Sequence, residues 1–318
     1  MASSLFGYRD LVLTSGKAEE MAQTLMQRIV EALPFLDRVA DAVQPEVQKA
    51  VDAGGTTARN VLDGVWFEAP LHPVLTDVPI GAWTTALVFD GLDLATGKKP
   101  LRHAADASLV FGILGAFGAA ATGLSDWRYL SGGSRRMGIA HGLLNTVGLT
   151  LIIVSLVQRA TGRRNAARLT FLTGYSINGM AAHIGGELSY HYGLRVDRNV
   201  FEKAGPDEFT AVLDENDLGP EELRRVEVEG VGVLLSRSGD DRICAIAATC
   251  NHFSGPLEQG EREGDTVVCP WHNSRFDLCS GQAIDGPAVF PQSRYETRTR
   301  DGKIEVKAAA ENIQKEVR

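Results

Sequence analysis

The chain has 318 residues and a formal net charge of −8, which allows two domains with sizeable buried cores. Residues 1–200 carry a net charge of +1 and residues 201–318 a net charge of −9, so the acidic excess lies in the last third. An acidic domain without clustered Lys and Arg argues against nucleic acid as a partner, because phosphate binding needs such a cluster. Four cysteines in a chain of this length exclude a small disulfide scaffold.

Residues 1–68 are expected to form an amphipathic helical segment. Apolar residues recur every three or four positions from Met21 to Leu33, and Pro34 opens a second such run. Such helices would lie on a membrane or pack against a soluble domain. Charged residues at positions 9 and 10 interrupt the first apolar stretch, which is too short for a secretory signal, so we expect the N-terminus in the cytoplasm.

Long charge-free runs follow, each close to the about 20 residues that cross a bilayer as a helix. They lie between Asp106 and Asp126, between Arg136 and Arg159, and between Arg168 and Glu187. A weaker run precedes them, in which only residues 78–89 are free of charge. Short basic loops between the runs suit an up-down-up-down bundle. We therefore expect residues 69–192 to form four transmembrane helices; a soluble domain with unusually apolar helices would leave the long runs unexplained.

The charges do not decide the orientation of this bundle, because seven Lys and Arg residues flank the helix ends on each face. An even number of spans places both termini on the same side. Since no secretory signal is visible, we expect a multi-pass protein of the cell's inner membrane with its C-terminal domain on the cytoplasmic side.

The residue pattern of the sequence changes after the expected bundle. Residues 193–206 read as a linker, and residues 207–318 as an all-β domain, because short β-rich segments alternate with turns that contain glycine. The fold class is therefore multidomain, an α-helical membrane bundle followed by an all-β domain, and no internal repeat is evident. Cys244 and Cys279 are expected to be separate buried thiols, since the cytosol is reducing.

Two matched pairs of potential metal ligands lie in the β domain. The stretch Cys250-Asn251-His252 is followed by Cys269-Pro270-Trp271-His272, so two loops each present one thiolate and one imidazole. Zinc is the alternative metal, although structural zinc sites usually draw on pairs of cysteines with the histidines elsewhere. The mixed spacing lets both cysteines bind one iron and both histidines the other, as in a Rieske [2Fe–2S] centre.

The sequence from residue 250 to residue 298 resembles the Rieske [2Fe–2S] ferredoxin-type family, and the likeness extends over about residues 207–307. The resemblance implies a cluster that a third, proline-bearing loop covers, a role that residues 286–291 (GPAVFP) would fill. The implied ligands of the cluster are Cys250, His252, Cys269 and His272.

Departures from the respiratory branch of this family bear on the reduction potential. Ser274 stands where a hydroxyl donates to the cluster, but Phe276 replaces a Tyr, and Gly255 and Trp271 replace the cysteines that join the two ligand loops. Fewer hydrogen bonds to sulfur predict a potential in the lower or middle part of about −150 to +300 mV. Reduction should couple to protonation of the ligand histidines at alkaline pH.

Ionisable residues also occur within the expected bundle, and by depth they gather at one membrane face. They are His72, Asp77, His141 and His183. Four interpretations stay open: a structural polar cluster, a haem b between His141 and His183, a metal site that uses all four residues, and a quinone or proton site. This helical segment also resembles an uncharacterised family of bacterial four-helix membrane domains, which implies no function.

The sequence thus predicts a membrane-anchored iron–sulfur protein that transfers one electron between redox proteins or a quinone. Two alternatives remain: a haem- or quinone-linked membrane oxidoreductase in which the cluster relays electrons to the bundle, and a membrane redox sensor. The chain shows no pair of histidines with a carboxylate spaced for a mononuclear iron, so we do not expect an oxygenase catalytic subunit.

Overall fold

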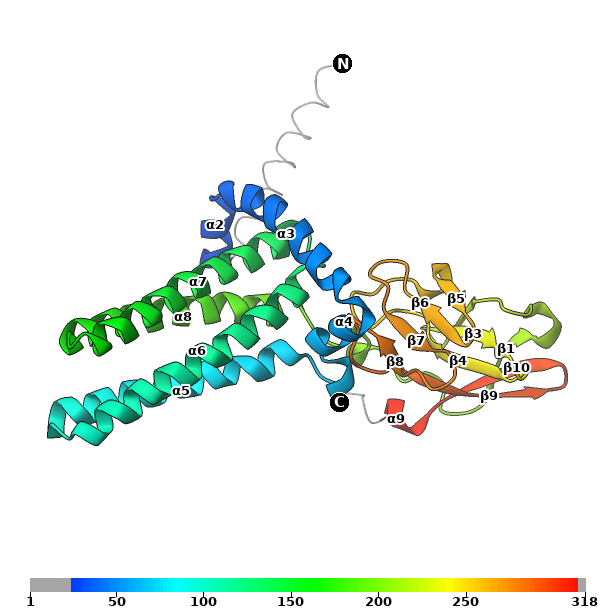
Figure 1. Cartoon of the computed structure of the whole chain (residues 1–318). Helices are drawn as coiled ribbons and strands as arrows, with labels where there is room; N and C mark the ends of the chain where they lie inside the picture. Colours follow the sequence, from blue (N-terminus) through cyan, green and yellow to red (C-terminus); the bar gives the residue numbers. More distant parts are fainter. Residues whose placement is uncertain (1–23, 314–318) are drawn as a thin grey trace, which may run out of the picture.

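The computed structural model describes residues 24–313, which divide into a helical half and a β half (Figure 1). The helices are α2 (Leu25–Glu31), α3 (Phe35–Ala53), α4 (Gly55–Asp63), α5 (Leu71–Thr96), α6 (Lys99–Trp127), α7 (Gly132–Ala160), α8 (Arg164–Tyr190) and α9 (Ala310–Ile313). The strands are β1 (Thr210–Asp214), β2 (Arg224–Val228), β3 (Val231–Arg237), β4 (Ile243–Ala247), β5 (Glu261–Glu263), β6 (Thr266–Val268), β7 (Arg275–Asp277), β8 (Ala283–Asp285), β9 (Arg294–Arg300) and β10 (Lys303–Ala308).

The described part of the amphipathic N-terminal segment consists of α2, α3 and α4; residues 1–23, Met21 among them, lie outside the described residues. Thr24 caps α2 by accepting the N–H of Gln27 at 3.2 Å, and the Gln27 side chain returns to the Thr24 N–H, which forms a capping box. The apolar faces of α2 and α3 pack on the ends of α6 and α7, where Val30 and Leu36 join a buried cluster. The N-terminal segment is therefore packed against the long helices through the apolar faces of α2 and α3.

Helices α5 to α8 form two antiparallel hairpins, α5–α6 and α7–α8, whose members pack along their whole length. Contacts between the two hairpins are much sparser. Among the described residues, α6 and α7 are the helices that are long and apolar enough to cross a membrane. The four long helices that the sequence predicts are present, and two of them meet this test of length and composition.

The two hairpins are copies of one pattern, which the sequence does not reveal. Four of the five buried positions of α5 recur in α7 at an offset of 69 residues, and the buried positions of α6 from Ala105 to Ala119 recur in α8 at an offset of 62. Matched positions are Pro79 and Gly148, Trp83 and Ile152, Ala86 and Ser155, Asp90 and Arg159, Ala105 and Ala167, Leu109 and Phe171, Gly112 and Gly174, and Ala119 and Ala181. Burial repeats while most side chains differ, so the repeat is visible only in the structure.

Charged residues within the bundle are neutralised at the end far from the β half. Asp90 and Asp93 are buried on α5, and each pairs with arginines of the other hairpin. Asp90 contacts Arg159, its counterpart in the repeat, and Asp93 contacts Arg168 and, at 2.9 Å, Arg102. Because an unpaired buried charge is costly, these pairs hold the two hairpins together.

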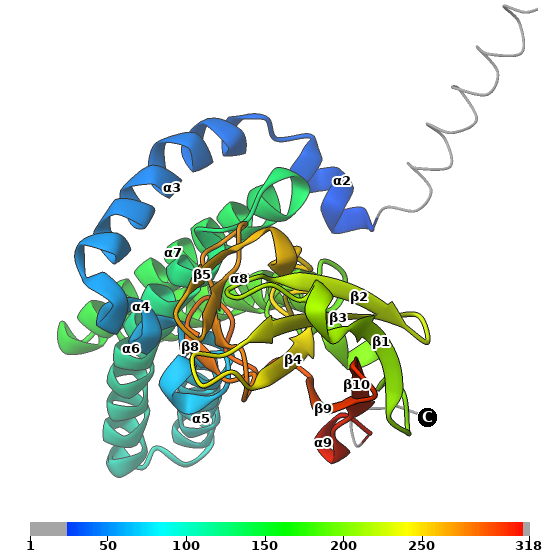
Figure 2. The same cartoon turned by 90° about the vertical axis from the view of Figure 1, so that its right-hand side faces the viewer.

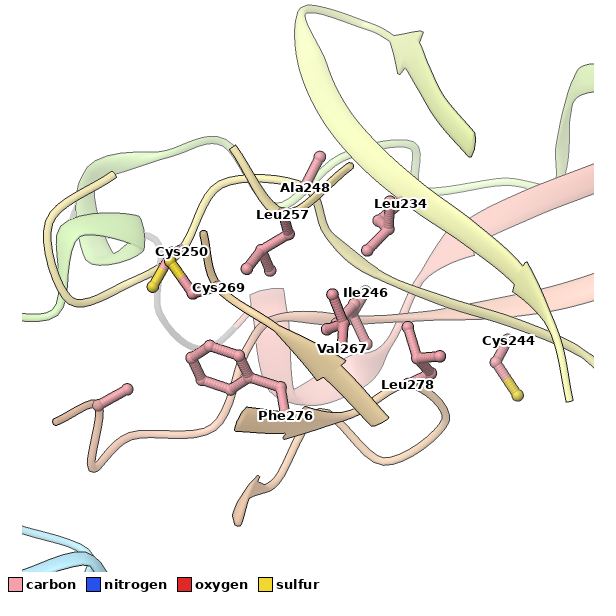
Figure 3. Close-up of a cluster of buried hydrophobic side chains, with 11 residues drawn as sticks. Leu234, Cys244, Ile246, Ala248, Cys250, Leu257, Val267, Cys269, Phe276 and Leu278 are labelled. Carbon is pink, nitrogen blue, oxygen red and sulfur yellow. The ribbon is translucent and has the colours of Figure 1, made fainter. Parts of the chain in front are cut away.

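The β half contains an antiparallel six-stranded sheet in the order β1-β10-β9-β4-β3-β2 and a four-stranded sheet in the order β5-β6-β7-β8. Leu234, Ile246, Val267 and Phe276 contribute to the core between them (Figure 3). The prediction of separate thiols is wrong, because Cys244 and Cys279 form a disulfide with their Cα atoms 4.7 Å apart. The two residues are 35 positions apart in the chain, but β4 and the turn after β7 bring them together in this core.

The two halves meet along α4 and the β8 edge. Figure 2 shows α3 curving past the ends of the bundle towards α4, which lies beside β8. Arg59 pairs with Asp285 at 2.7 Å, and the Asn60 side chain accepts from the Gly286 N–H at 3.0 Å and donates to the Ile284 carbonyl at 3.1 Å. The N-terminal helices thus link the bundle to the β half at the loop that follows β8.

Candidate iron–sulfur site

The expected ligands lie on two loops with the same backbone design, one after β4 and one between β6 and β7. In each loop the cysteine N–H donates to the carbonyl five residues later, at 2.8 Å, and the cysteine carbonyl accepts the N–H four residues later. That fourth residue has a positive φ in both loops, 62° at Ser254 and 61° at Asn273. Two twin turns therefore present Cys250 and Cys269 in matching positions, with a histidine two or three residues further on.

The two cysteine side chains are buried and form neither a disulfide with each other nor one with another residue. The Cys250 thiol donates a hydrogen bond to the Cys269 sulfur, which together with nearby N–H groups lowers the pKa of Cys269 to about 6 and raises the pKa of Cys250. A Cβ at Gly255 would lie 2.8 Å from the Cys269 sulfur, so only glycine leaves room for it. The thiols are thus adjacent and one of them ionises readily, as metal ligands must.

The two histidines form the second pair. Their ring centroids lie 5.2 Å apart at an interplanar angle of 89°. His252 is only 5% exposed, and both of its ring nitrogens are buried without a hydrogen-bond partner among the described residues. Such an orphaned imidazole is costly, because buried polar atoms normally have partners. An iron bound to one nitrogen removes this cost, so the residues present fit the cluster that the sequence implies.

The third loop, residues 286–291, closes over the ligand loops. The Asn251 side chain donates to the carbonyls of Phe290 at 2.8 Å and Pro291 at 3.2 Å, which ties the first ligand loop to the third. Ser274 is fully buried, and its hydroxyl accepts the Ala288 N–H at 3.0 Å, so its own proton remains available to donate. Phe276 is buried in the core as a purely apolar neighbour.

A tyrosine of the helical half covers the histidine pair. Tyr129, in the turn between α6 and α7, has its ring centroid 5.3 Å from that of His272 and 5.9 Å from that of His252. Its hydroxyl accepts a hydrogen bond from Arg128 at 2.8 Å. Phe253, next to His252, packs on the apolar cluster that α2, α3 and α7 share. The histidine edge of the site therefore faces the helical half, with His252 buried and His272 partly exposed.

A buried ion-pair network fixes this arrangement. Asp63, at the end of α4, is fully buried and accepts from Arg128 at 2.9 Å and from Arg195 at 2.8 Å. Arg195 also donates to Asp126 at 2.8 Å and to the carbonyl of Pro287 in the third loop. The negative charges of two carboxylates balance the positive charges of two guanidiniums. The network therefore joins α4, the end of α6 and the chain after α8 to the third loop without a net buried charge.

The membrane histidines do not gather as the sequence suggested. His141 contacts the face of α8 that carries Ala181 and Gly185, whereas His183 is two residues from each and therefore about 200° away on the helix. The His183 side chain is 65% exposed and pairs with Glu187 at 3.4 Å. Asp77 is exposed. A haem between His141 and His183, and a metal site of all four residues, are therefore contradicted, because equal depth does not mean the same helix face.

Sequence reasoning missed the residues that join the two halves: Asp63, Arg128, Tyr129 and Arg195. Arg128 and Arg195 were counted only as helix-end charges, Asp63 was not singled out, and a tyrosine at a helix end is an ordinary interfacial residue. No local pattern marks such residues, because their partners lie 62 to 132 positions away in the chain.

The arrangement separates the ligands into a sulfur pair and an imidazole pair. Among residues 24–313, no three His, Cys, Asp or Glu side chains are grouped to hold a single metal ion. A two-iron cluster needs two protein ligands for each iron, which is the pairing that the two loops provide.

Comparison with known proteins divides the chain in the same way. Residues 68–198 match the family "Predicted membrane protein (DUF2231)", and residues 208–296 match the family "Rieske [2Fe-2S] domain". Ferredoxin CarAc of Metapseudomonas resinovorans is 30% identical over 91 residues, which are 29% of this chain and 85% of that protein. The ferredoxin component of the naphthalene 1,2-dioxygenase system of Pseudomonas putida is 30% identical over 79 residues, 25% of this chain and 75% of that protein.

A solved complex of reduced oxygenase and oxidised ferredoxin in carbazole 1,9a-dioxygenase contains a chain that is 28% identical, with a TM-score of 0.31, over 32% of this chain and 94% of that one. The two family matches together with the ferredoxin relatives identify both halves. The chain belongs to the Rieske [2Fe–2S] family through its C-terminal domain, which is fused to a predicted membrane protein domain, DUF2231.

Proposed function

We propose that this protein is a membrane-anchored carrier of single electrons, in which Cys250 and Cys269 hold one iron of a [2Fe–2S] cluster and His252 and His272 hold the other. The observation that carries the proposal is the buried His252 ring, whose two nitrogens have no hydrogen-bond partner among the described residues, beside a pair of adjacent free thiols. When bound, the cluster supplies reversible uptake and release of one electron.

The surrounding residues serve that chemistry by position. Ser274 keeps a buried hydroxyl proton available, and a hydrogen bond to a cluster sulfur would stabilise the more negative reduced state. Burial and the positive charge of Arg195 lower the pKa of His252 well below its usual range. Tyr129 packs on the histidine pair and the third loop is bonded to the first ligand loop, so that His252 and both cysteines are buried. The chain therefore holds the ligands in one geometry, which limits reorganisation when the electron moves.

We propose that the four long helices anchor this carrier in the inner membrane as a multi-pass domain. Two of them have the length and composition to cross a bilayer, and large apolar side chains face outwards: Phe111 is 61% exposed, Leu114 64% and Leu169 67%. The Cys244–Cys279 disulfide bears on the orientation, because disulfides persist in oxidising compartments. It favours the oxidising side for the β half, opposite to the cytoplasmic side that the sequence suggested.

Partner proteins are proposed as the donor and the acceptor of the electron. Of the relatives named above, one is the ferredoxin component of a naphthalene 1,2-dioxygenase system, and the similar solved chain belongs to a complex of oxygenase and ferredoxin. In this chain Trp271, between two ligands, is 56% exposed and offers an apolar contact beside the site. Exposed acidic residues near β1 add a surface that can steer a basic partner. A quinone at the membrane is the alternative acceptor.

A second candidate function is a relay into the helical half. This function is favoured by the contact of Tyr129 with both ligand histidines, because the histidine edge of the site then faces the turn between α6 and α7. In this version the cluster passes its electron to a centre or a quinone in the bundle and not to a soluble protein.

The experiment that tests the proposed function uses the full-length protein in mild detergent. We expect two irons and two acid-labile sulfides per chain, an EPR signal only after reduction, and exchange of one electron per chain with a chemical mediator. Cys250→Ser should remove the iron, while Ser280→Ala, an exposed serine of the same domain, should retain it. Wild-type protein that binds no iron, or binds one zinc, would overturn the proposal.

A further inference from the structure

His72 and His141 occupy equivalent places in the two hairpins. They are separated by 69 residues, the same offset that relates the buried positions of α5 and α7. His72 Nδ1 lies 2.8 Å from the carbonyl of Ala119, and His141 Nδ1 lies 2.8 Å from the carbonyl of Ala181. These two alanines are themselves 62 residues apart, the offset between α6 and α8. The repeat therefore preserves a histidine together with its carbonyl partner, while most of the other matched side chains differ.

The hydrogen bonds fix which ring nitrogen is free. A carbonyl only accepts, so Nδ1 carries the proton in both histidines and Nε2 carries the lone pair. The Asn145 amide nitrogen lies 3.1 Å from Nε2 of His141 and donates to it, in agreement with this tautomer. Among the described residues, Nε2 of His72 has no hydrogen-bond partner. An Nδ1–H bonded to a backbone carbonyl, with Nε2 left over, is the usual state of a histidine that binds a metal.

The edge of each ring also packs closely against a glycine of its partner helix. A Cβ at Gly123 would be 2.8 Å from His72, and a Cβ at Gly185 would be 3.1 Å from His141. Each glycine follows its carbonyl-bearing alanine by four residues, so it lies on the same helix face. The two rings are thus held at the same depth and by the same contacts, one from each hairpin.

The two rings approach one another across the hairpin boundary. Their centroids are 6.3 Å apart at an interplanar angle of 85°. An iron bound at about 2.0 Å by each of two imidazole nitrogens requires a ring spacing of this size. Contacts between the two hairpins are much sparser than those within each hairpin, so a group bound between the hairpins displaces few helix contacts. In membrane transporters, the boundary between internal repeats is a common place for binding sites.

We propose that His72 and His141 are the two axial ligands of a haem held between the α5–α6 and α7–α8 hairpins. A bare metal ion would need further protein ligands, and among residues 24–313 no group of three or more donor side chains exists to hold one. A haem brings four nitrogens of its own and needs two from the protein. All four cysteines of the sequence lie in the β half, so the haem is bound without thioether bonds. Its iron takes the lone pair on His141 that Asn145 now caps.

The proposed haem lies within reach of the proposed cluster. Ala119, which holds His72, is ten residues before Tyr129 on the same helix and turn, or about 15 Å along the axis. Tyr129 in turn contacts both cluster histidines. A single electron can therefore pass from the reduced cluster to ferric iron, which oxidises the cluster and gives ferrous iron without making or breaking a bond. The haem site itself rests only on the helical half and not on the cluster.

The test is haem retention by the full-length protein in detergent, purified from cells supplied with a haem precursor or incubated with hemin. Optical spectra and pyridine haemochrome quantification should give one haem per chain with a low-spin spectrum. His72→Ala and His141→Ala should each lower the haem content at least tenfold, while His183→Ala, in the same bundle, should leave it unchanged. His72→Met should keep haem with an altered spectrum, which separates loss of a ligand from loss of the fold.

A cluster-free variant, Cys250→Ser, should still bind haem, which makes failure of the two proposals distinguishable. Wild-type protein that contains the cluster but takes up no haem would overturn the haem site alone. It would also be overturned if His72→Ala retained the low-spin spectrum, if His183→Ala lost it, or if the His72 and His141 pair bound a stoichiometric zinc or copper ion in its place.

Discussion

Replacement of Asp63 by asparagine tests whether the two halves are fastened through their buried ion pairs. Asp63 is fully buried and accepts from Ser125 at 2.8 Å, from Arg128 at 2.9 Å and from Arg195 at 2.8 Å. In Asp63→Asn, Arg195 keeps its pair with Asp126, while the buried guanidinium of Arg128 loses the carboxylate that it pairs with. Removing one partner of a buried ion pair costs about 3–5 kcal/mol, so separation of the halves should become about 10²- to 5 × 10³-fold more frequent.

Hydrogen exchange followed by mass spectrometry measures this opening directly, because the Gly286 N–H is bonded to Asn60 across the boundary. Peptides that cover residues 286–291 should exchange about 10²- to 5 × 10³-fold faster in Asp63→Asn, while peptides from β3 and β4 keep their protection. The matched control is Asp241→Asn, because Asp241 is exposed and pairs with Arg237 on the surface. Unchanged exchange at residues 286–291 in Asp63→Asn would refute the ion-pair account of the boundary.

Three further outcomes are expected. Ser274→Ala should lower the reduction potential by about 65–130 mV, since a hydrogen bond to a charged group contributes about 1.5–3 kcal/mol and 59 mV is tenfold for one electron. Voltammetry of Ser274→Thr should show a smaller change. An unchanged potential in Ser274→Ala would exclude a hydrogen bond from this serine to the cluster. Alkylation of the denatured, non-reduced protein should label only Cys250 and Cys269. Joint replacement of Cys244 and Cys279 by alanine should lower the free energy of unfolding by about 4 kcal/mol, as expected for a 35-residue separation. Labelling of all four cysteines without reductant would contradict the disulfide. Tyr129→Ala should speed reduction of the cluster by a water-soluble reductant, measured by stopped flow, because the histidine edge becomes open to water; an unchanged rate would show that the edge is already accessible.

The sequence predicts much of the β half and its site because the information there is local. Each ligand loop carries its cysteine and histidine within four residues, and the turn residues that shape it, such as Asn273, lie in the same stretch. Four long helices could likewise be expected from charge-free runs, since hydrophobicity and length suffice for that inference. The pairing of the cysteines into a sulfur pair also follows from the matched spacing of the two loops.

The predictions that were wrong or missing concern contacts between positions that are distant in the chain. Depth placed His141 and His183 together, but only the helix phase shows that His183 points away and that His72 is the neighbour of His141. The Cys244–Cys279 bond was missed because separate thiols were expected in a reducing cytosol, whereas the positions of β4 and the turn after β7 decide whether the two cysteines meet. The hairpin repeat was missed because burial, and not residue identity, is what repeats in α5 and α7.

The central claim is that two cysteines and two histidines hold a two-iron cluster under the cover of the helical half. The most direct measurement is pulsed EPR of the reduced full-length protein, with iron and sulfide quantified on the same sample. The account predicts two irons per chain and couplings from two histidine nitrogens in the wild-type protein. A reduced centre without histidine nitrogen couplings, or a single metal ion per chain, would contradict it.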